Sequence, residues 1–148
     1  MKKAYKFSIL YFLLFALILL WSSYMLFERK IGFSIDSVLE YYLGNEEKFM
    51  VMYSWSGMLK VILPHIFAFG LFSMVVLHFL IFTNSKHFKR TKVLILILFI
   101  SGAFELLSPF FIINGFEFFA AVKLVSFFVF ELCLLYLFYL LFFSIVNE

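Results

Sequence analysis

The sequence predicts an all-α membrane protein, a four-transmembrane-helix antiparallel bundle with a short external interfacial helix. Two observations predict this fold class. Of the 148 residues, 66% are hydrophobic and only 14% are charged, and the apolar residues are gathered in four long runs. A water-soluble domain has about a quarter of its residues charged, so this chain lacks the polar surface that water requires. Its length accommodates four spans in a single integral membrane domain, residues 1–148.

Each apolar run is long enough to form a transmembrane helix, which needs about 20 residues. The predicted spans are residues 7–27, 61–82, 93–113 and 118–143. The first span follows three lysines and is not succeeded by a small-residue cleavage motif. We therefore expect it to be retained rather than removed as a signal peptide. Pro64 is expected in the first turn of the second span, where a missing N–H costs little.

Residues 28–60 form the most polar part of the chain, and we expect them to lie on the external side of the membrane. Ser34 is a suitable N-cap, and apolar residues then recur at helical spacing before Gly44 and Asn45 provide a stop signal. This pattern predicts a short amphipathic helix lying in the bilayer interface. Tyr53 and Trp55 are expected to anchor the start of the second span at the same interface.

The basic residues indicate the orientation of the bundle. They gather at the N-terminus and in the predicted loop 83–92, which a four-span topology places on the same side: Lys2, Lys3, Lys6, Lys86, Lys89, Arg90 and Lys92. Short basic loops stay in the cytoplasm. We therefore expect a multi-pass protein of the bacterial inner membrane with both termini in the cytoplasm. The basic clusters are interpreted as contacts with lipid headgroups, and no nucleic-acid partner is expected.

Titratable side chains inside the spans are candidates for function, because each is costly in lipid unless it is paired or solvated. Glu105 and Glu131 lie near the middle of their spans, and Ser101 and Ser108 share a helix face with Glu105. The resulting hypothesis is a ligand or proton site. Its candidate residues are His65, Glu105, Glu131, Lys123, Ser101 and Ser108. The alternative is that these polar groups only hold the helices together.

Three functions are compatible with these residues. The first is a non-enzymatic bundle that binds a ligand or supports a partner, either a second copy or a membrane complex. The second is a redox-associated protein binding haem b or quinone, with His65 and His78 as candidate haem or metal ligands. The third is an oligomeric proton or cation pathway through the midplane carboxylates. No catalytic or metal-hydrolase motif is found in the sequence, which favours the first function and leaves any metal unidentified.

Several segments resemble a group of small bacterial four-helix inner-membrane proteins to which no activity is assigned. The similar segments are Leu63–Gly70, His78–Thr83, Val38–Glu47 and Glu105–Phe110. The resemblance implies a four-span membrane fold, with a His-Ile-Phe opening to the second helix and an acid-x-x-Ser-Pro-aromatic stretch in the third. Phe69 stands where the group has methionine, and His65 lacks the second histidine of a His-x-His pair. The resemblance therefore gives no support to paired-histidine ligation.

Overall fold

The computed structural model describes residues 3–83 and 89–147. These residues form five α-helices and one short 3-10 helix, and no strand is present among them. The helices are α1 (Lys3–Lys30), α2 (Ile35–Leu43), α3 (Trp55–Ile81), α4 (Lys89–Ile113) and α5 (Phe119–Asn147), with the 3-10 helix at Glu46–Lys48. The four long helices have the length and hydropathy of membrane spans. The prediction of an all-α membrane protein with four spanning helices is therefore confirmed.

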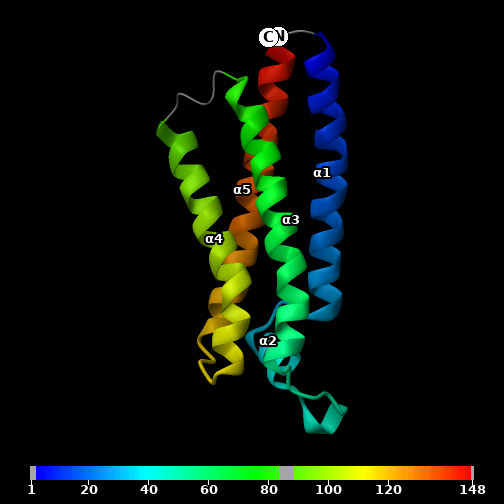
Figure 1. The fold of residues 1–148 in the computed structure, drawn as a ribbon, viewed down its shortest axis with the longest axis vertical. Helices are drawn as coiled ribbons and strands as arrows, with labels where there is room; N and C mark the ends of the chain where they lie inside the picture. Colours follow the sequence, from blue (N-terminus) through cyan, green and yellow to red (C-terminus); the bar gives the residue numbers. More distant parts are fainter. Residues whose placement is uncertain (1–2, 84–88, 148) are drawn as a thin grey trace.

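The long helices run alternately up and down, so the two chain termini lie at the same end of the bundle (Figure 1). We call this the terminal end. The short helix α2 lies at the opposite end, between α1 and α3 in the chain, and we call that end the α2 end. A loop after α2 projects beyond the bundle there before the chain enters α3 (Figure 1).

Helix α3 begins earlier than the sequence predicts. Ser54 caps it by accepting a hydrogen bond from the Gly57 N–H, so the helix includes the polar residues 55–60 that hydropathy assigns to the external segment. The expected position of Pro64 is therefore wrong, because it lies inside α3 rather than in the first turn. Helix α4 likewise starts at Lys89, within the predicted loop 83–92. Residues 84–88 of that loop lie outside the described residues.

Two clusters of buried side chains hold the helices together. The larger joins all four long helices from the terminal end to the middle of the bundle: Ile9, Leu13, Ala16, Leu20, Val76, Leu80, Leu98, Cys133, Leu134, Leu137, Phe138, Leu141 and Ile145. The smaller lies under α2 and joins it to α3, α4 and α5: Val38, Tyr42, Met58, Ile62, Ile112, Ile113 and Ala120. Because α2 buries its own apolar face, it is an integral part of the bundle's end.

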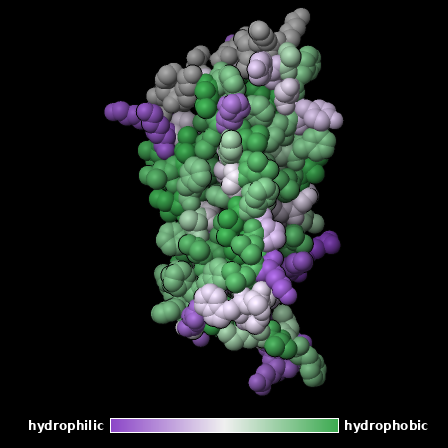
Figure 2. Space-filling view, viewed as in Figure 1, coloured by the Kyte–Doolittle hydropathy of each residue, from purple (hydrophilic) through white to green (hydrophobic). Residues whose placement is uncertain are grey.

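The surface between the two ends is a broad apolar band, with hydrophilic residues near the ends (Figure 2). Large side chains in the spans are freely exposed, including Phe67 at 74% and Phe7 at 71%. Such contiguous apolar exposure is rare on soluble monomers. Lipid chains are therefore the solvent that this band requires.

The loop between α2 and α3 is tied to α2 by Glu40. Its carboxylate accepts hydrogen bonds from the Asn45 side-chain amide at 2.8 Å and from Lys48 Nζ at 2.9 Å. The hydrogen bond from Lys48 and its positive charge, together with the hydrogen bond from Asn45, hold the pKa of the Glu40 carboxyl below its ordinary value of 4.5. Gly44 has φ +86°, and a Cβ there would lie 2.5 Å from the Met50 carbonyl oxygen. The loop therefore has a defined conformation rather than a loose one.

Acidification should loosen this loop. A carboxyl whose pKa is lowered by folding stabilises the fold above its unfolded pKa, and that stabilisation is lost as the pH falls through the folded pKa. Hydrogen exchange of residues 44–52 should therefore rise below about pH 4.5, after correction for intrinsic exchange rates. In Glu40→Gln the same amides should exchange rapidly already at neutral pH. Unchanged protection across this range in the unmodified chain would contradict the role of Glu40.

Helix α3 approaches α4 closely at Gly102. A Cβ at Gly102 would lie 2.3 Å from the ring of Phe69 on α3. The Phe69 ring also contacts Phe99 and Phe130, with ring centroids 6.3 and 5.0 Å away. The ring is thus enclosed by aromatic neighbours, and the glycine provides the space that it occupies.

Gly102→Ala should destabilise the bundle by about 1–3 kcal/mol, because the added methyl group overpacks this contact. Gly70→Ala is the matched control, since a Cβ at Gly70 meets nothing within 4 Å. The free energy of unfolding, measured in mixed micelles, should fall in the first variant only. Phe69→Leu in the Gly102→Ala background should recover part of the loss. An equal effect of the two glycine substitutions would argue against the close approach.

Candidate functional site

The intramembrane polar residues begin with an ion pair between α4 and α5, the most extensively packed pair of helices. Lys123 on α5 forms a salt bridge with the Glu105 carboxylate on α4. The same ammonium group donates a hydrogen bond to the Glu105 backbone carbonyl at 2.8 Å. Lys123 is only 5% exposed. Its charge is thus compensated within the bundle and is held away from lipid.

Pro109 explains why the Glu105 carbonyl is available to Lys123. In an α-helix this carbonyl would accept a hydrogen bond from the N–H four residues later, at position 109. Proline has no N–H, and Pro109 lies inside α4. An unpaired carbonyl in an apolar environment is costly. Lys123 supplies the missing donor and neutralises the Glu105 carboxylate at the same time.

Helix α2 covers the bundle end nearest this ion pair. Val38 and Tyr42 are its buried residues. Burial, followed by the nearby negative charge of Glu105, raises the pKa of Tyr42 well above its ordinary value of 10.0. Next to it, the Tyr53 hydroxyl donates a hydrogen bond to the Tyr41 hydroxyl at 3.1 Å. Burial and this neighbour raise the pKa of Tyr41 to about 12. Tyr41 and Tyr42 therefore both stay neutral at physiological pH.

The two candidate serines of α4 are buried and bonded within their own helix. Ser101 donates to the Leu98 carbonyl at 3.1 Å, and Ser108 donates to the Phe104 carbonyl. Both lie on the helix that carries Glu105, as the spacing predicts. Their hydroxyl protons are used by the backbone, so neither donates to a ligand in this conformation.

The structure does not bring the histidines to the ion pair. His65 is exposed, and its Nδ1 lies 2.6 Å from the Val61 carbonyl oxygen of its own helix. His78 is exposed as well, and its ring packs edge-on against Phe82 with centroids 5.3 Å apart. Among residues 3–83 and 89–147, no three His, Cys, Asp or Glu side chains are grouped to hold a metal. The predicted site therefore divides into separate parts.

Glu131 is separated from the ion pair by its position on α5. It lies two residues from Cys133, the midpoint of α5, which is about 3 Å along the helix axis. Its carboxyl interacts with the Ser23 hydroxyl on α1 and experiences the negative charge of Glu105. Within the described chain it forms no ion pair. Glu131 is thus an intramembrane acid without a cationic partner there.

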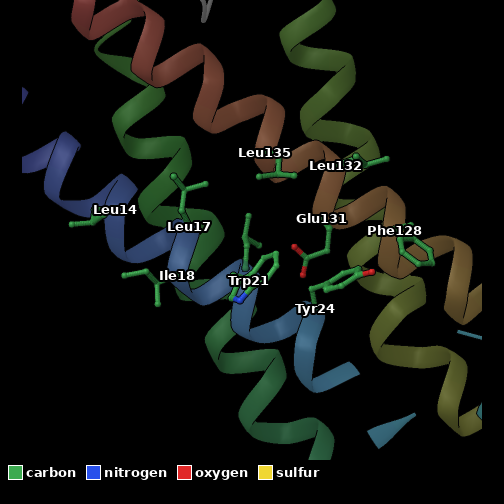
Figure 3. A pocket seen from close by; sticks show the side chains of 10 residues that line it. Leu14, Leu17, Ile18, Trp21, Tyr24, Phe128, Glu131, Leu132 and Leu135 are labelled. Atoms are coloured by element: carbon green, nitrogen blue, oxygen red, sulfur yellow. The ribbon is translucent and has the colours of Figure 1, made fainter. Parts of the chain in front are cut away.

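A groove of about 620 Å³ lies between α1 and α5, and Glu131 forms part of its wall. Figure 3 shows the carboxyl directed away from α5 toward Trp21 and Tyr24 of α1. The groove is lined by Leu14, Leu17, Ile18, Leu20, Trp21, Tyr24, Phe128, Glu131, Leu132 and Leu135. Leu14, Ile18 and Leu132 are each more than half exposed. Since these exposed side chains belong to the apolar band, the groove opens toward lipid.

The lining is chemically graded along the bundle. Trp21 lies beside Glu131, Tyr24 and Phe128 lie toward the α2 end, and Leu14 and Leu135 lie toward the terminal end (Figure 3). Trp21 and Tyr24 are stacked, with centroids 6.3 Å apart. The volume is within the range of small-molecule sites, about 300–1,000 Å³. The arrangement suits a mostly apolar molecule with one polar group.

Sequence reasoning identified Glu131 but missed the α1 wall of this groove. Trp21, Tyr24 and Ser23 carry no motif, and aromatic residues near a span end normally indicate interfacial anchoring. The signal that could have identified them is their spacing. Tyr24 is three residues after Trp21, so both lie on one face of α1. That face could not be matched to Glu131 without the helix packing.

Lys123→Met should lower the free energy of unfolding by about 3 kcal/mol, because it leaves the Glu105 carboxyl and carbonyl unpaired. Pro109→Ala restores an N–H to the helix, so the same Lys123 substitution should cost about 1 kcal/mol less in that background. A double-mutant cycle in mixed micelles measures this difference. Lys48→Met, at the exposed pair with Glu40, is the control and should cause little change. Strict additivity of Lys123→Met and Pro109→Ala would show that the carbonyl is satisfied in another way.

The comparisons with known proteins agree with this architecture. No curated protein and no solved structure gives a significant match to the chain. A family model described as a transmembrane helical domain matches residues 32–148, which include α2 to α5 and therefore Glu105, Lys123 and Glu131. The matched region leaves out α1. The chain belongs to this family of transmembrane helical domains, Aq_1264_TM.

Proposed function

We propose that this protein is a non-enzymatic binding protein that takes a lipophilic molecule from the bilayer into the groove between α1 and α5. The observation that carries the proposal is the position of Glu131. It places one carboxyl on the wall of an otherwise apolar groove that opens toward lipid. An ionisable group at this depth is expensive unless it is paired or solvated. A bound molecule with one polar group would satisfy it.

The lining supports binding rather than catalysis. Apart from Glu131, the described lining offers only the Tyr24 hydroxyl and the Trp21 N–H as polar side-chain groups. A nucleophile is commonly activated by a base within hydrogen-bond reach, and that base is held in turn by a third group. A groove with one acid, a stacked aromatic pair and a leucine-rich floor provides affinity and orientation. It provides no second reacting group.

The distribution of charge supports an inner-membrane protein with both termini in the cytoplasm. Lys89, Arg90 and Lys92 lie at the start of α4, at the same end of the bundle as the termini. Lys6 also lies there and donates to the Ile145 carbonyl at 3.1 Å. Basic residues next to spans favour the cytoplasmic side. On this proposal α2 and its following loop face away from the cytoplasm, and the groove opens near the middle of the bilayer.

The geometry gives less support to the other two functions. A pathway through both midplane carboxylates would need Glu105 to exchange its proton or ion, but Lys123 occupies that carboxylate. Haem ligation by His65 and His78 would need the two imidazoles to share a site. They lie 13 residues apart on one helix, which places them about 140° apart around its axis. Neither function is supported by a specific contact.

The two tryptophans provide a direct test, because Trp21 lines the groove and Trp55 lies at the start of α3. In the Trp55→Phe variant Trp21 is the sole tryptophan, and in the Trp21→Phe variant Trp55 is the sole tryptophan. The probes are three bromophenyl-substituted molecules of one shape: a tetraphenylphosphonium cation, a tetraphenylmethane and a tetraphenylborate anion. In lipid nanodiscs, at least one should quench Trp21 saturably and Trp55 only weakly and without saturation.

Filling the groove should weaken this quenching. Leu17→Phe adds volume inside the groove and should reduce apparent affinity about tenfold, as expected for overpacking by 1–3 kcal/mol. Leu63→Phe makes the same change on the exposed face of α3 and should have no effect. Quenching that rises linearly with every probe, equally for Trp21 and Trp55, would mean that the groove binds none of them and would overturn the proposal.

A further inference from the structure

The two intramembrane acids differ in one respect that bears on the ligand. Glu105 has a cation from within the chain, since Lys123 bridges it. Glu131 has none among the described residues, and the surrounding lining is apolar or aromatic. An ionised Glu131 therefore requires a positive charge that the described lining does not supply.

We propose that the ligand of the groove is a lipophilic organic cation, bound with its charge beside the Glu131 carboxylate and the aromatic side chains of Trp21 and Tyr24. This inference rests on the proposed binding function and names the chemical class of the ligand. Within the apolar band an ion pair is screened weakly, so a cation–carboxylate contact is stronger there than in water. The same environment penalises an anion beside the Glu131 carboxylate.

The aromatic residues beside Glu131 favour the same class. Trp21 and Tyr24 stack with an interplanar angle of 26°, so they present extended ring surfaces near the carboxyl (Figure 3). The faces of such rings attract cations, and more strongly when water is excluded. Phe128 adds a third ring from α5. A carboxylate with aromatic rings around it combines the two interactions by which proteins bind organic cations.

The depth of Glu131 restricts the kind of cation. The carboxyl lies about 3 Å from the midpoint of α5 along its axis, far from the headgroups of both leaflets. A compact ammonium is strongly hydrated and costly to bring to this depth. A cation whose charge is spread over, or shielded by, apolar groups loses less hydration. The leucines at the other end of the groove would contact its apolar part.

The three probes of equal shape separate this inference from the binding function. The phosphonium cation should quench Trp21 with an apparent affinity at least about tenfold higher than the neutral methane analogue. The borate anion should bind more weakly than either. Glu131→Gln, which keeps the side-chain shape, should reduce cation binding to the level of the neutral analogue. Unchanged binding of the neutral analogue by the variant shows that its groove is intact.

Glu117→Gln is the matched control, because Glu117 is an exposed acid in the turn before α5, and it should leave all three affinities unchanged. A short-chain quinone is included as a competitor of different chemistry. Equal affinities for the cation and its neutral analogue, or a quinone that displaces the cation at lower concentration, would overturn the cation assignment and leave the binding function standing. Failure of all the probes to quench Trp21 saturably would overturn both.

Discussion

The contact on which the α2 end of the bundle depends is made by one ammonium group. Lys123 serves two acceptors of Glu105, the carboxylate and the backbone carbonyl. The second acceptor exists because Pro109 cannot donate to it. A proline, an acid and a lysine that would each be unfavourable in lipid thus become mutually compatible. These contacts form only when α4 and α5 pack in one register. Helix α2 then packs over the end of that helix pair.

This contact also determines which intramembrane acid has no cationic partner among the described residues. Since Lys123 is fully engaged with Glu105, the second acid of the spans must be satisfied elsewhere. Glu131 faces the opposite neighbour of α5, where α1 offers the Ser23 hydroxyl and two aromatic rings. The family domain, residues 32–148, contains the whole ion pair and the α5 wall of the groove. Helix α1 supplies the other wall, so the groove exists only where α1 packs against that domain.

Much of this fold was predictable from the sequence, because lipid imposes simple requirements on helices. Length and hydropathy predict the four spans, and Ser34 with Gly44 delimits α2 as the structure has it. The start of α3 was missed since Ser54 caps a helix whose first turns are polar, which a hydropathy criterion excludes. The grouping of His65 with Glu105 and Lys123 relied on depth alone. The residue number gives the depth of a side chain in the bilayer, whereas helix packing decides which way the side chain points around the helix axis. His65 is exposed because of that packing.

The same distinction explains why an apolar chain can carry a binding site that its composition hides. Each of the four long helices is nearly uniform in hydropathy around its axis, so no amphipathic face marks an interior. What separates lipid-facing from protein-facing positions is the contact between helices. Helix α1 meets the rest mainly through α5. Its core contacts are Ile9, Leu13, Ala16 and Leu20, and nearer the α2 end the buried Phe27 stacks on Phe127 with centroids 4.0 Å apart. The groove opens on the lipid-facing side of this helix pair, between Leu14 and Tyr24 of α1, and Glu131 lies on its α5 wall. An acid without a cationic partner among the described residues therefore lies on a wall that faces lipid, where a ligand from the bilayer can reach it.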